Sequence, residues 1–430
     1  MFTDRYGLEL TTDSRAAADA FVEGVDRVLA ATADVEPMFE TAIEADPTFA
    51  LPHAALARQH QLCGRPAQAR AAAEHAASLV HAATLRERQF VEIFTKLVTG
   101  DVPAALSLTK AHLADFPRDA FVLAPSCSVF GLIGFSGRIA REPEQVALLE
   151  PLASHYGDDW WFLTVHAFAL VEFGQWERGR ELVERALALY PRNAVGAHIR
   201  AHALYEGGED ALALEYLADW LPDYSPKGLM HCHLWWHYCL ANMIVGNQRE
   251  ALRAYDEQCA PGVSVSPSIN ILTDGAALLW RSELAGQART PARWERLCDY
   301  YESTFPRPMV FVDAHAALAY AALGRTDELN AYIEQVQSLG EAGKLPAGTV
   351  GATLSRAYRA FAAERWSETI DILEEVLPKV VRIGGSRAQR DLITNTLLAA
   401  YVKDGRHDVA RKFLENITDR QPARPVAGLS

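Results

Sequence analysis

The sequence lacks a long apolar run and a surplus of basic residues. No window approaches about 18 consecutive apolar residues, so no membrane-spanning helix is expected. Acidic residues outnumber basic ones, 55 to 41, which gives a net charge of −14. An acidic surface repels phosphate backbones and anionic lipids, so we expect neither nucleic acid nor a membrane as a partner.

The sequence also lacks closely spaced cysteine pairs and a leader segment. Six scattered cysteines without a CxxC pair, in a chain of this length, indicate reduced and mostly buried thiols. The first residues, MFTDRYGLELTTDS, contain neither a basic nor an apolar signal region, so no secretory signal is expected. These features predict a cytoplasmic protein.

Several catalytic motifs are missing as well. There is no GxGxxG after a strand, no GxxxxGK[ST] and no GxSxG, which argues against nucleotide-driven and α/β-hydrolase chemistry. No alternating strand pattern of useful length occurs either, so the β content is expected to be near zero. The sequence therefore predicts an all-α protein.

Helical hairpins recur along the chain. Residues 168–191 and 202–222 each contain a helix, a turn marked by glycine, an alanine-rich second helix and a closing proline. The turn glycines Gly174, Gly208 and Gly246 are 34 and 38 residues apart, and 34 is the tetratricopeptide period. Two short amphipathic helices bury their apolar faces only by stacking on neighbours. The pattern predicts a tetratricopeptide-repeat-like superhelix, an α-α solenoid of roughly eleven helical hairpins.

We expect one superhelix over residues 1–430, with an N-terminal capping region at 1–45 and a flexible tail at 420–430. Two stretches break the repeat. The glycine-rich residues 127–142 predict a bent connector between hairpins. Residues 379–391 place two glycines before a helix at which Ser386 is the expected N-cap. The alternative there is an anion held by the helix N-terminus with Arg387 and Arg390.

Several segments carry a family likeness, mainly in the C-terminal two-thirds of the chain. They are DDWWFLTVHAFALVEFGQWERG (158–179), AHIRAHALYEGG (197–208), HCHLWWHYCLANMIVGNQREALRAYD (231–256), DGAALLWRSELAG (274–286), FVDAHAALAYAALGR (311–325) and GGSRAQRD (384–391). In these segments the chain resembles the bacterial branch of the tetratricopeptide repeat protein 38 family. The resemblance implies a helical superhelix over the full length, and it implies little about activity.

Histidines gather between His166 and His237, where six of the fourteen fall within 72 residues. Two pairs have His-x-x-x-His spacing, HIRAH (198–202) and HLWWH (233–237). This spacing puts both imidazoles on one face of a helix, where two nitrogens reach one metal ion. Relative to the following turn glycines the two pairs differ by three residues, close to one helical turn, so they should face the same way in adjacent first helices. We therefore predict that His198, His202, His233 and His237 converge and offer a site for a divalent transition metal, although no cofactor is certain.

Acidic and basic residues occur at similar depths in the next first helices. Asp274 or Asp313 could orient the imidazoles, and Arg281 could pair with a substrate carboxylate or, alternatively, with Glu283 or a neighbour. A purely structural interpretation stays open, in which the histidines are satisfied by hydrogen bonds and the tryptophans are packing residues. The candidates for lining the groove are His166, His198, His202, His233, Trp236, His237, Asp274, Arg281, Asp313 and His315.

The predicted function is ligand binding by this concave, His/Trp/Asp-rich inner surface, with a partner peptide or protein or a small molecule as the ligand. The alternative is an enzyme with a small-molecule pocket, a metal-assisted hydrolase or lyase that uses the histidine cluster. A third possibility is a homo-oligomeric scaffold, and the sequence does not set the oligomeric state. The metal hypothesis requires that the four imidazoles lie close enough together to share a ligand.

Overall fold

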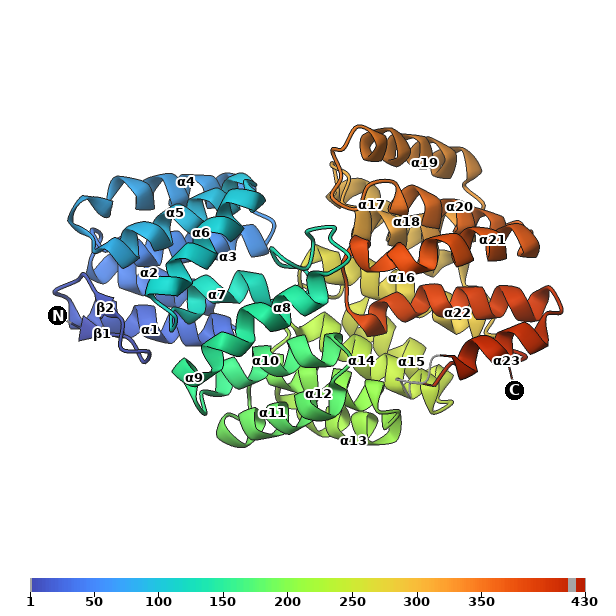
Figure 1. Ribbon diagram of the computed structural model, residues 1–430, viewed down its shortest axis with the longest axis horizontal. Helices are drawn as coiled ribbons and strands as arrows, with labels where there is room; N and C mark the ends of the chain where they lie inside the picture. The colour runs from blue at the N-terminus through green and yellow to red at the C-terminus, as the bar shows by residue number, and fades with distance from the viewer. Residues whose placement is uncertain (1, 417–422, 430) are drawn as a thin grey trace.

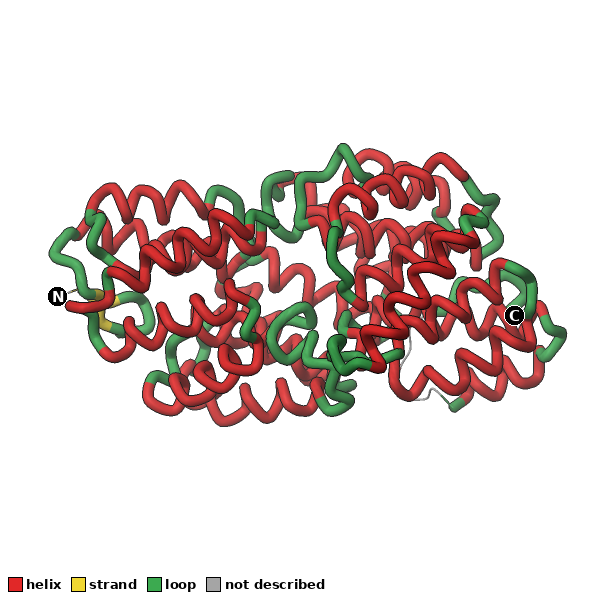
Figure 2. Tube along the Cα trace, turned by 90° about the horizontal axis from the view of Figure 1, so that it is seen from above, coloured by secondary structure: helices red, strands yellow, loops and turns green. Residues whose placement is uncertain are grey.

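Helical hairpins follow one another from one end of the molecule to the other in the computed structural model, which describes residues 2–416 and 423–429 (Figure 1). The N-terminus and the C-terminus lie at opposite ends of the long axis. A small antiparallel pair of strands, β1 (Phe2–Thr3) and β2 (Glu9–Leu10), precedes the first helix. Helices and turns make up the rest of the described chain, as Figure 2 shows from a second direction, so the predicted all-α solenoid is confirmed.

The described residues contain ten regular hairpins. The N-terminal ones are α1 (Arg15–Ala30) with α2 (Val35–Ala45), α3 (Ala50–Leu62) with α4 (Pro66–Ser78), and α5 (Leu85–Thr99) with α6 (Val102–Asp115). The central ones are α10 (Trp160–Glu172) with α11 (Trp176–Leu189), α12 (Ala194–Glu206) with α13 (Asp210–Trp220), and α14 (His231–Ile244) with α15 (Gln248–Ala254). The C-terminal ones are α16 (Ser268–Leu284) with α17 (Pro291–Thr304), α18 (Val310–Leu323) with α19 (Thr326–Glu341), α20 (Val350–Ala362) with α21 (Trp366–Val376), and α22 (Arg387–Lys403) with α23 (His407–Glu415).

The repeat is interrupted between α6 and α10. Helix α7 (Ala120–Cys127) is followed by a non-helical connector, then by α8 (Arg141–Leu149) and the short α9 (Ala153–Tyr156). The expected bent connector at 127–142 is therefore present. Short helical turns also extend α4, α8, α13, α15 and α21, namely Val80–Ala82, Glu150–Leu152, Leu221–Asp223, the π-helical Tyr255–Cys259 and Leu377–Ile383.

The turns and caps follow the sequence signals. The turn glycines have positive φ angles between 67° and 92°, a backbone conformation that side chains disfavour, which explains glycine at these sites. They are Gly64, Gly100, Gly174, Gly208, Gly246, Gly286, Gly324 and Gly405. Ser386 caps α22 in a capping box with Gln389, as the sequence predicts for an N-cap.

The two helices of a hairpin differ in burial. In α10, α12, α14, α16 and α18 nearly every residue is buried, whereas a second helix such as α11 buries one stripe that contains Val183, Ala186 and Leu187. A helix that is covered on all sides belongs to the interior, and one with a single apolar stripe belongs to the surface. The first helices therefore form an inner layer, and the second helices cover it.

Helix α22 returns to this inner layer and covers it. It contacts α16 and also α12, which lies far away in the sequence. The Trp280 indole N–H of α16 donates to the Thr396 hydroxyl at 3.0 Å, and Arg141 of α8 donates to the Val381 carbonyl at 2.9 Å. The superhelix thus closes on itself where α22 covers the inner helices α12 and α16.

The C-terminal segment packs against the last hairpins where the structure describes it. The Ala427 amide donates to the Leu284 carbonyl at 2.8 Å, and Arg424 forms an ion pair with Asp391 at 2.9 Å. The expected flexible tail at 420–430 lies partly outside the described residues, and its flexibility stays a prediction.

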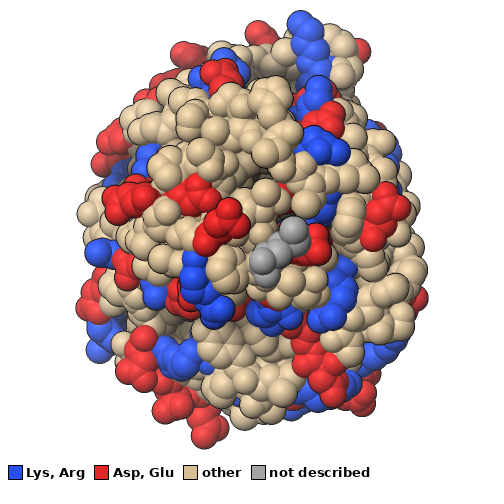
Figure 3. Space-filling view, turned by 90° about the vertical axis from the view of Figure 1, so that its left-hand side faces the viewer, with Lys and Arg blue, Asp and Glu red and all other residues tan. Residues whose placement is uncertain are grey.

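Acidic and basic side chains are interspersed on the N-terminal end of the molecule (Figure 3). Among the described residues, no helix combines the length and the apolarity that crossing a bilayer requires. All six cysteines are free thiols.

Candidate metal centre

Four histidines from two neighbouring inner helices meet in the interior. His198 and His202 come from α12, and His233 and His237 come from α14. One ring nitrogen of each lies within 4.8 Å of the corresponding nitrogens of the others. The spacing that a shared ligand requires is therefore present, and the predicted convergence of the two pairs is confirmed.

The cluster is almost completely buried. His198, His233 and His237 keep 6%, 5% and 4% of their surfaces accessible, whereas His202 keeps none. The Nε2 atoms of His198 and His202 are 2.8 Å apart, so one ring donates a hydrogen bond to the other. A bound metal ion would replace this hydrogen bond, because a nitrogen that binds a metal presents its lone pair and carries no proton.

Helix caps hold α12 and α14 in place. The Asn193 side-chain oxygen accepts a hydrogen bond from the Gly196 amide at 3.1 Å, and its NH₂ group donates to Thr164 of α10 at 2.9 Å. This one side chain starts α12 and fastens it to the preceding inner helix. At the start of α14, the Cys232 amide donates to the Ser266 hydroxyl at 3.0 Å. Both His-x-x-x-His pairs thereby begin within the first two turns of anchored helices.

Asp274 of α16 orients His233. Its Oδ2 accepts a hydrogen bond from His233 Nδ1 at 2.7 Å, and both groups are buried. The Asp274 carboxylate is itself held by Asn270 and by Gln389 of α22, each at 3.3 Å. A carboxylate that accepts from Nδ1 fixes the tautomer and leaves the Nε2 lone pair to face the cluster, which is the arrangement found behind metal-bound histidines.

A second carboxylate lies behind His202. Glu172 Oε1, at the end of α10, is 3.6 Å from His202 Nδ1. Burial raises the pKa of Glu172 to about 7, although Arg390 and Arg141 oppose the shift. Glu172 Oε2 also accepts from the Arg387 amide at 2.7 Å. Carboxylates thus stand behind one histidine of each pair.

Glu172 occupies the N-terminus of α22. The anion proposed for this terminus is therefore supplied by the protein itself, and Arg390 pairs with Glu142. The sequence analysis missed Glu172. A signal for it existed, because Glu172 and Glu206 both stand two residues before a turn glycine at the end of consecutive first helices.

Aromatic rings wall the cluster. Phe168 packs on His198 and His202 with ring centroids 5.5 and 5.3 Å apart. Trp236 stacks on His233 at 5.2 Å with an interplanar angle of 8°. Burial, followed by repulsion from neighbouring imidazoles, lowers the pKa values of His198 and His237 well below the usual value. These two rings are therefore neutral at pH 7, the form in which imidazole binds metals.

The remaining candidates divide into those near the cluster and those apart from it. His166 packs on Phe162 and is not among the residues whose ligand atoms converge in the cluster. Asp313 is fully buried and accepts from the Tyr301 hydroxyl at 3.0 Å, so of the two carboxylates offered as orienting groups it is Asp274 that bonds to an imidazole.

Arg281 and His315 lie on the inner helices next to Asp274. The Arg281 guanidinium donates to the Ala388 carbonyl at 2.5 Å. Glu283, its alternative partner, bonds instead to Arg289 and to the Trp294 indole. Glu283 is therefore not the partner of Arg281.

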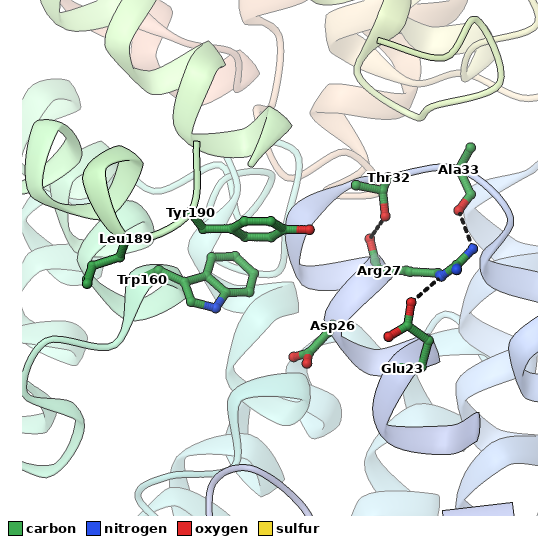
Figure 4. Close-up of a pocket in the computed structure, with 8 residues that line it drawn as sticks. All are labelled: Glu23, Asp26, Arg27, Thr32, Ala33, Trp160, Leu189 and Tyr190. Carbon is green, nitrogen blue, oxygen red and sulfur yellow. Dashed lines mark hydrogen bonds and ion pairs between the residues drawn. The ribbon is translucent and has the colours of Figure 1, made fainter. Parts of the chain in front are cut away.

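A separate cleft of about 540 Å³ lies between α1 and the ends of α10 and α11 (Figure 4). Trp160 and Tyr190 form one wall, and Glu23 and Asp26 form the other. Both carboxylates already have cationic partners, since Glu23 bonds to Arg27 at 2.7 Å and Asp26 pairs with Arg5 at 2.6 Å. The two carboxylates of this cleft are therefore already neutralised by arginines of the protein.

The class of protein is defined by these features: a tetratricopeptide-repeat-like superhelix with a buried four-histidine cluster. No protein-family model matches the chain. It is similar to human IFIT1 in a dimer with m7Gppp-AAAA, at 14% identity and a TM-score of 0.42 over 95% of each chain. It is similar as well to the Cut9 and Hcn1 hetero-tetramer of APC/C, at 11% identity and a TM-score of 0.40 over 93% of this chain and 85% of that one. For yeast Tom70 the values are 13% and 0.35, over 95% and 84%. At these values the likeness concerns helical-repeat architecture alone, and no ligand or partner is carried over.

Proposed function

We propose that this protein binds a divalent transition metal at the four-histidine cluster and uses the enclosed interior to hold a small molecule. The observation that carries the proposal is the convergence of four ring nitrogens within 4.8 Å, with Asp274 bonded to one of the rings. Imidazole nitrogens suit zinc, copper, nickel and iron, and they do not suit magnesium or calcium.

The residues fit such an ion. Nitrogens bound tetrahedrally at about 2.0–2.1 Å lie roughly 3.3 Å from one another. The observed separations, 2.8 Å for one pair and at most 4.8 Å in the group, bracket this value, so modest ring rotations bring the four atoms together. Burial keeps His198 and His237 neutral, which removes the competition with protons at pH 7.

The covering of the inner helices by α22 favours a small molecule over a peptide. An extended peptide needs an open surface along the solenoid, whereas α22 and the segment before it cover the inner helices here. A small ligand needs only a few converging polar groups among apolar walls, as the rings of Phe168 and Trp236 provide beside the histidines. A peptide or partner protein in the groove would require α22 to move away from α12 and α16.

Catalysis is the second candidate, as a metal-assisted hydrolase or lyase. The carboxylate–histidine pair of Asp274 and His233 favours it, because such a pair can hold a proton or tune a bound metal. A closed site with four imidazole ligands would be structural, whereas three ligands and one open position would be catalytic.

Metal content tests the proposal. The full-length untagged protein is measured by inductively coupled plasma mass spectrometry beside the double variant His198→Ala/His237→Ala. We expect close to one metal ion per chain in the wild type and almost none in the variant. The matched control is His166→Ala, which removes a buried histidine of α10 that lies outside the cluster, and it should keep the metal. A wild-type protein that stays metal-free after exposure to zinc, copper, nickel and iron would overturn the proposal.

We infer further that the chain is a cytoplasmic, bacterial member of the tetratricopeptide repeat protein 38 family. The resembling segments at 158–179, 197–208 and 231–256 coincide with α10, α12 and α14, the helices that build the cluster and its walls. Six unpaired thiols accord with a reducing compartment. A homologue that keeps all four histidines but binds no metal would contradict the metal proposal and leave the family assignment intact.

A further inference from the structure

Arg281 is a buried cation without a carboxylate partner. Only 1% of its surface is accessible. Among the described residues no acidic side chain forms an ion pair with it, and its Nε has no hydrogen-bond partner. Other buried arginines are paired, as Arg86 is with Asp119 at 2.7 Å. An unpaired buried charge is strongly destabilising, so a site of this kind calls for an anion from outside the chain.

His315 lies on α18, which packs against α16. Its Nδ1 donates to the Phe311 carbonyl at 2.7 Å, so its Nε2 keeps a lone pair, and that atom is buried without a partner in the described residues. Burial lowers the pKa of His315 to about 4, while Asp274 opposes the shift and Arg281 adds to it. His315 is therefore a neutral acceptor, and it lies on the inner helix that packs against the one carrying the Arg281 cation.

We propose that Arg281 and His315 form an oxyanion-binding subsite for a small ligand that carries a carboxylate or phosphate group together with a hydroxyl group. The guanidinium matches two oxygens of such an anion, and the hydroxyl donates to His315 Nε2. A 2-hydroxy carboxylate and a protonated phosphate both offer this combination. Asp274 stands two helical turns before Arg281 on α16 and contacts His233, so the subsite adjoins the histidine cluster.

The inference deepens the proposed small-molecule function and names its ligand class, but it does not depend on a bound metal. The test uses the full-length protein, stripped of metal by a chelator, and follows its thermal unfolding midpoint at constant ionic strength. The probes are inorganic phosphate, glycolate and acetate. We expect a saturable rise with phosphate, with glycolate or with both, and which of them acts identifies the anion. Acetate lacks the hydroxyl and should act at least about tenfold more weakly than glycolate.

Variants locate the effect. Arg281→Met keeps the apolar part of the side chain and should abolish the rise, whereas Arg281→Lys keeps the charge and should weaken the apparent affinity about tenfold. The matched control is Arg289→Met, because that guanidinium lies at the surface and pairs with Glu283. It should respond to the anions as the wild type does. If Arg281→Met fails to fold, the comparison of Arg281→Lys with the wild type decides.

The inference is overturned if neither phosphate nor glycolate gives a saturable rise in the wild type, or if Arg281→Met keeps it. Equal responses to acetate and glycolate would overturn the role of His315. The metal proposal is judged separately, because Arg281→Met should retain the wild-type metal content. An anion effect without any metal would sustain the subsite and overturn the metal centre alone.

Discussion

His233 Nδ1 lies 2.7 Å from Asp274 Oδ2, and this contact joins α14 to α16 behind the four-histidine cluster. The carboxylate sets which nitrogen of His233 faces the other three rings. Since Asp274 is in turn held by Gln389 of α22, the helix that closes the superhelix also supports the orientation of a candidate metal ligand.

Asp274→Asn should weaken metal binding without abolishing it. The amide keeps the shape but is a poorer acceptor and can present its NH₂ group to His233, so we expect about 10- to 100-fold lower affinity. Competition with a chromogenic zinc chelator measures this. The matched control is Asp313→Asn, which changes a buried carboxyl group that bonds to Tyr301, and it should bind zinc as the wild type does. Equal affinities for all three proteins would contradict the orienting role of Asp274.

Asp313 should make the protein less stable as the pH rises. Burial raises the pKa of Asp313 to about 7 from 3.8, although the Tyr301 hydroxyl opposes the shift, and the buried Tyr332 also faces the carboxyl group. Because the folded-state pKa is the higher one, the stabilising contribution is complete below about pH 4 and is lost as the pH rises to about 7. The change is roughly 4 kcal/mol at most.

Urea unfolding between pH 4 and pH 8 checks this expectation. Asp313→Asn should remove that part of the pH dependence and should be more stable than the wild type at pH 8. The exposed Asp327→Asn, at the start of α19, is the control and should follow the wild-type profile. Parallel profiles for Asp313→Asn and the wild type would show that the carboxyl group titrates normally.

Asp119, in the N-terminal half, should make the protein less stable as the pH falls. Burial alone would raise its pKa, but Arg86 and His112 bring the pKa down to about 2. A lowered folded-state pKa means that the stabilisation is present above about pH 4 and is lost as the pH falls toward 2. The stabilisation by the ionised Asp119 carboxylate amounts to about 2 kcal/mol. Asp119→Asn should remove this acid-sensitive contribution, as measured by urea unfolding from pH 2 to pH 5, whereas the exposed cap variant Asp101→Asn should keep it.

Gly385→Ala should destabilise the segment that closes the superhelix. Gly385 has a φ of +72°, and a Cβ there would lie 2.3 Å from the Phe311 ring. Backbone strain and overpacking together should cost about 2–5 kcal/mol. Gly405→Ala is the control, since Gly405 has a φ of +77° with open space around it and should cost only about 1 kcal/mol. Equal losses in urea unfolding would mean that the ring of Phe311 moves away without cost.

The local pattern of the chain determined the repeat and the faces of its helices. Glycines at regular intervals end the first helices, because each adopts a positive φ. The i, i+4 spacing placed His198 with His202 and His233 with His237, and an offset of three residues relative to the turn glycines, close to one helical turn, aligned the two pairs. These relationships span adjacent hairpins, in which repeat geometry varies little, so the sequence sufficed.

The tertiary structure alone decided what lies opposite those faces. The curvature of a solenoid is the sum of small rotations between repeats, so the return of α22 onto α12 and α16 cannot be read from any one hairpin. That return brings Gln389 to Asp274 and the Ala388 carbonyl to Arg281. The sequence offered either Asp274 or Asp313 as the group that orients an imidazole and did not choose between them. Similar depth along a helix does not fix the direction of a side chain, so Asp313 bonds to Tyr301 while Asp274 reaches His233.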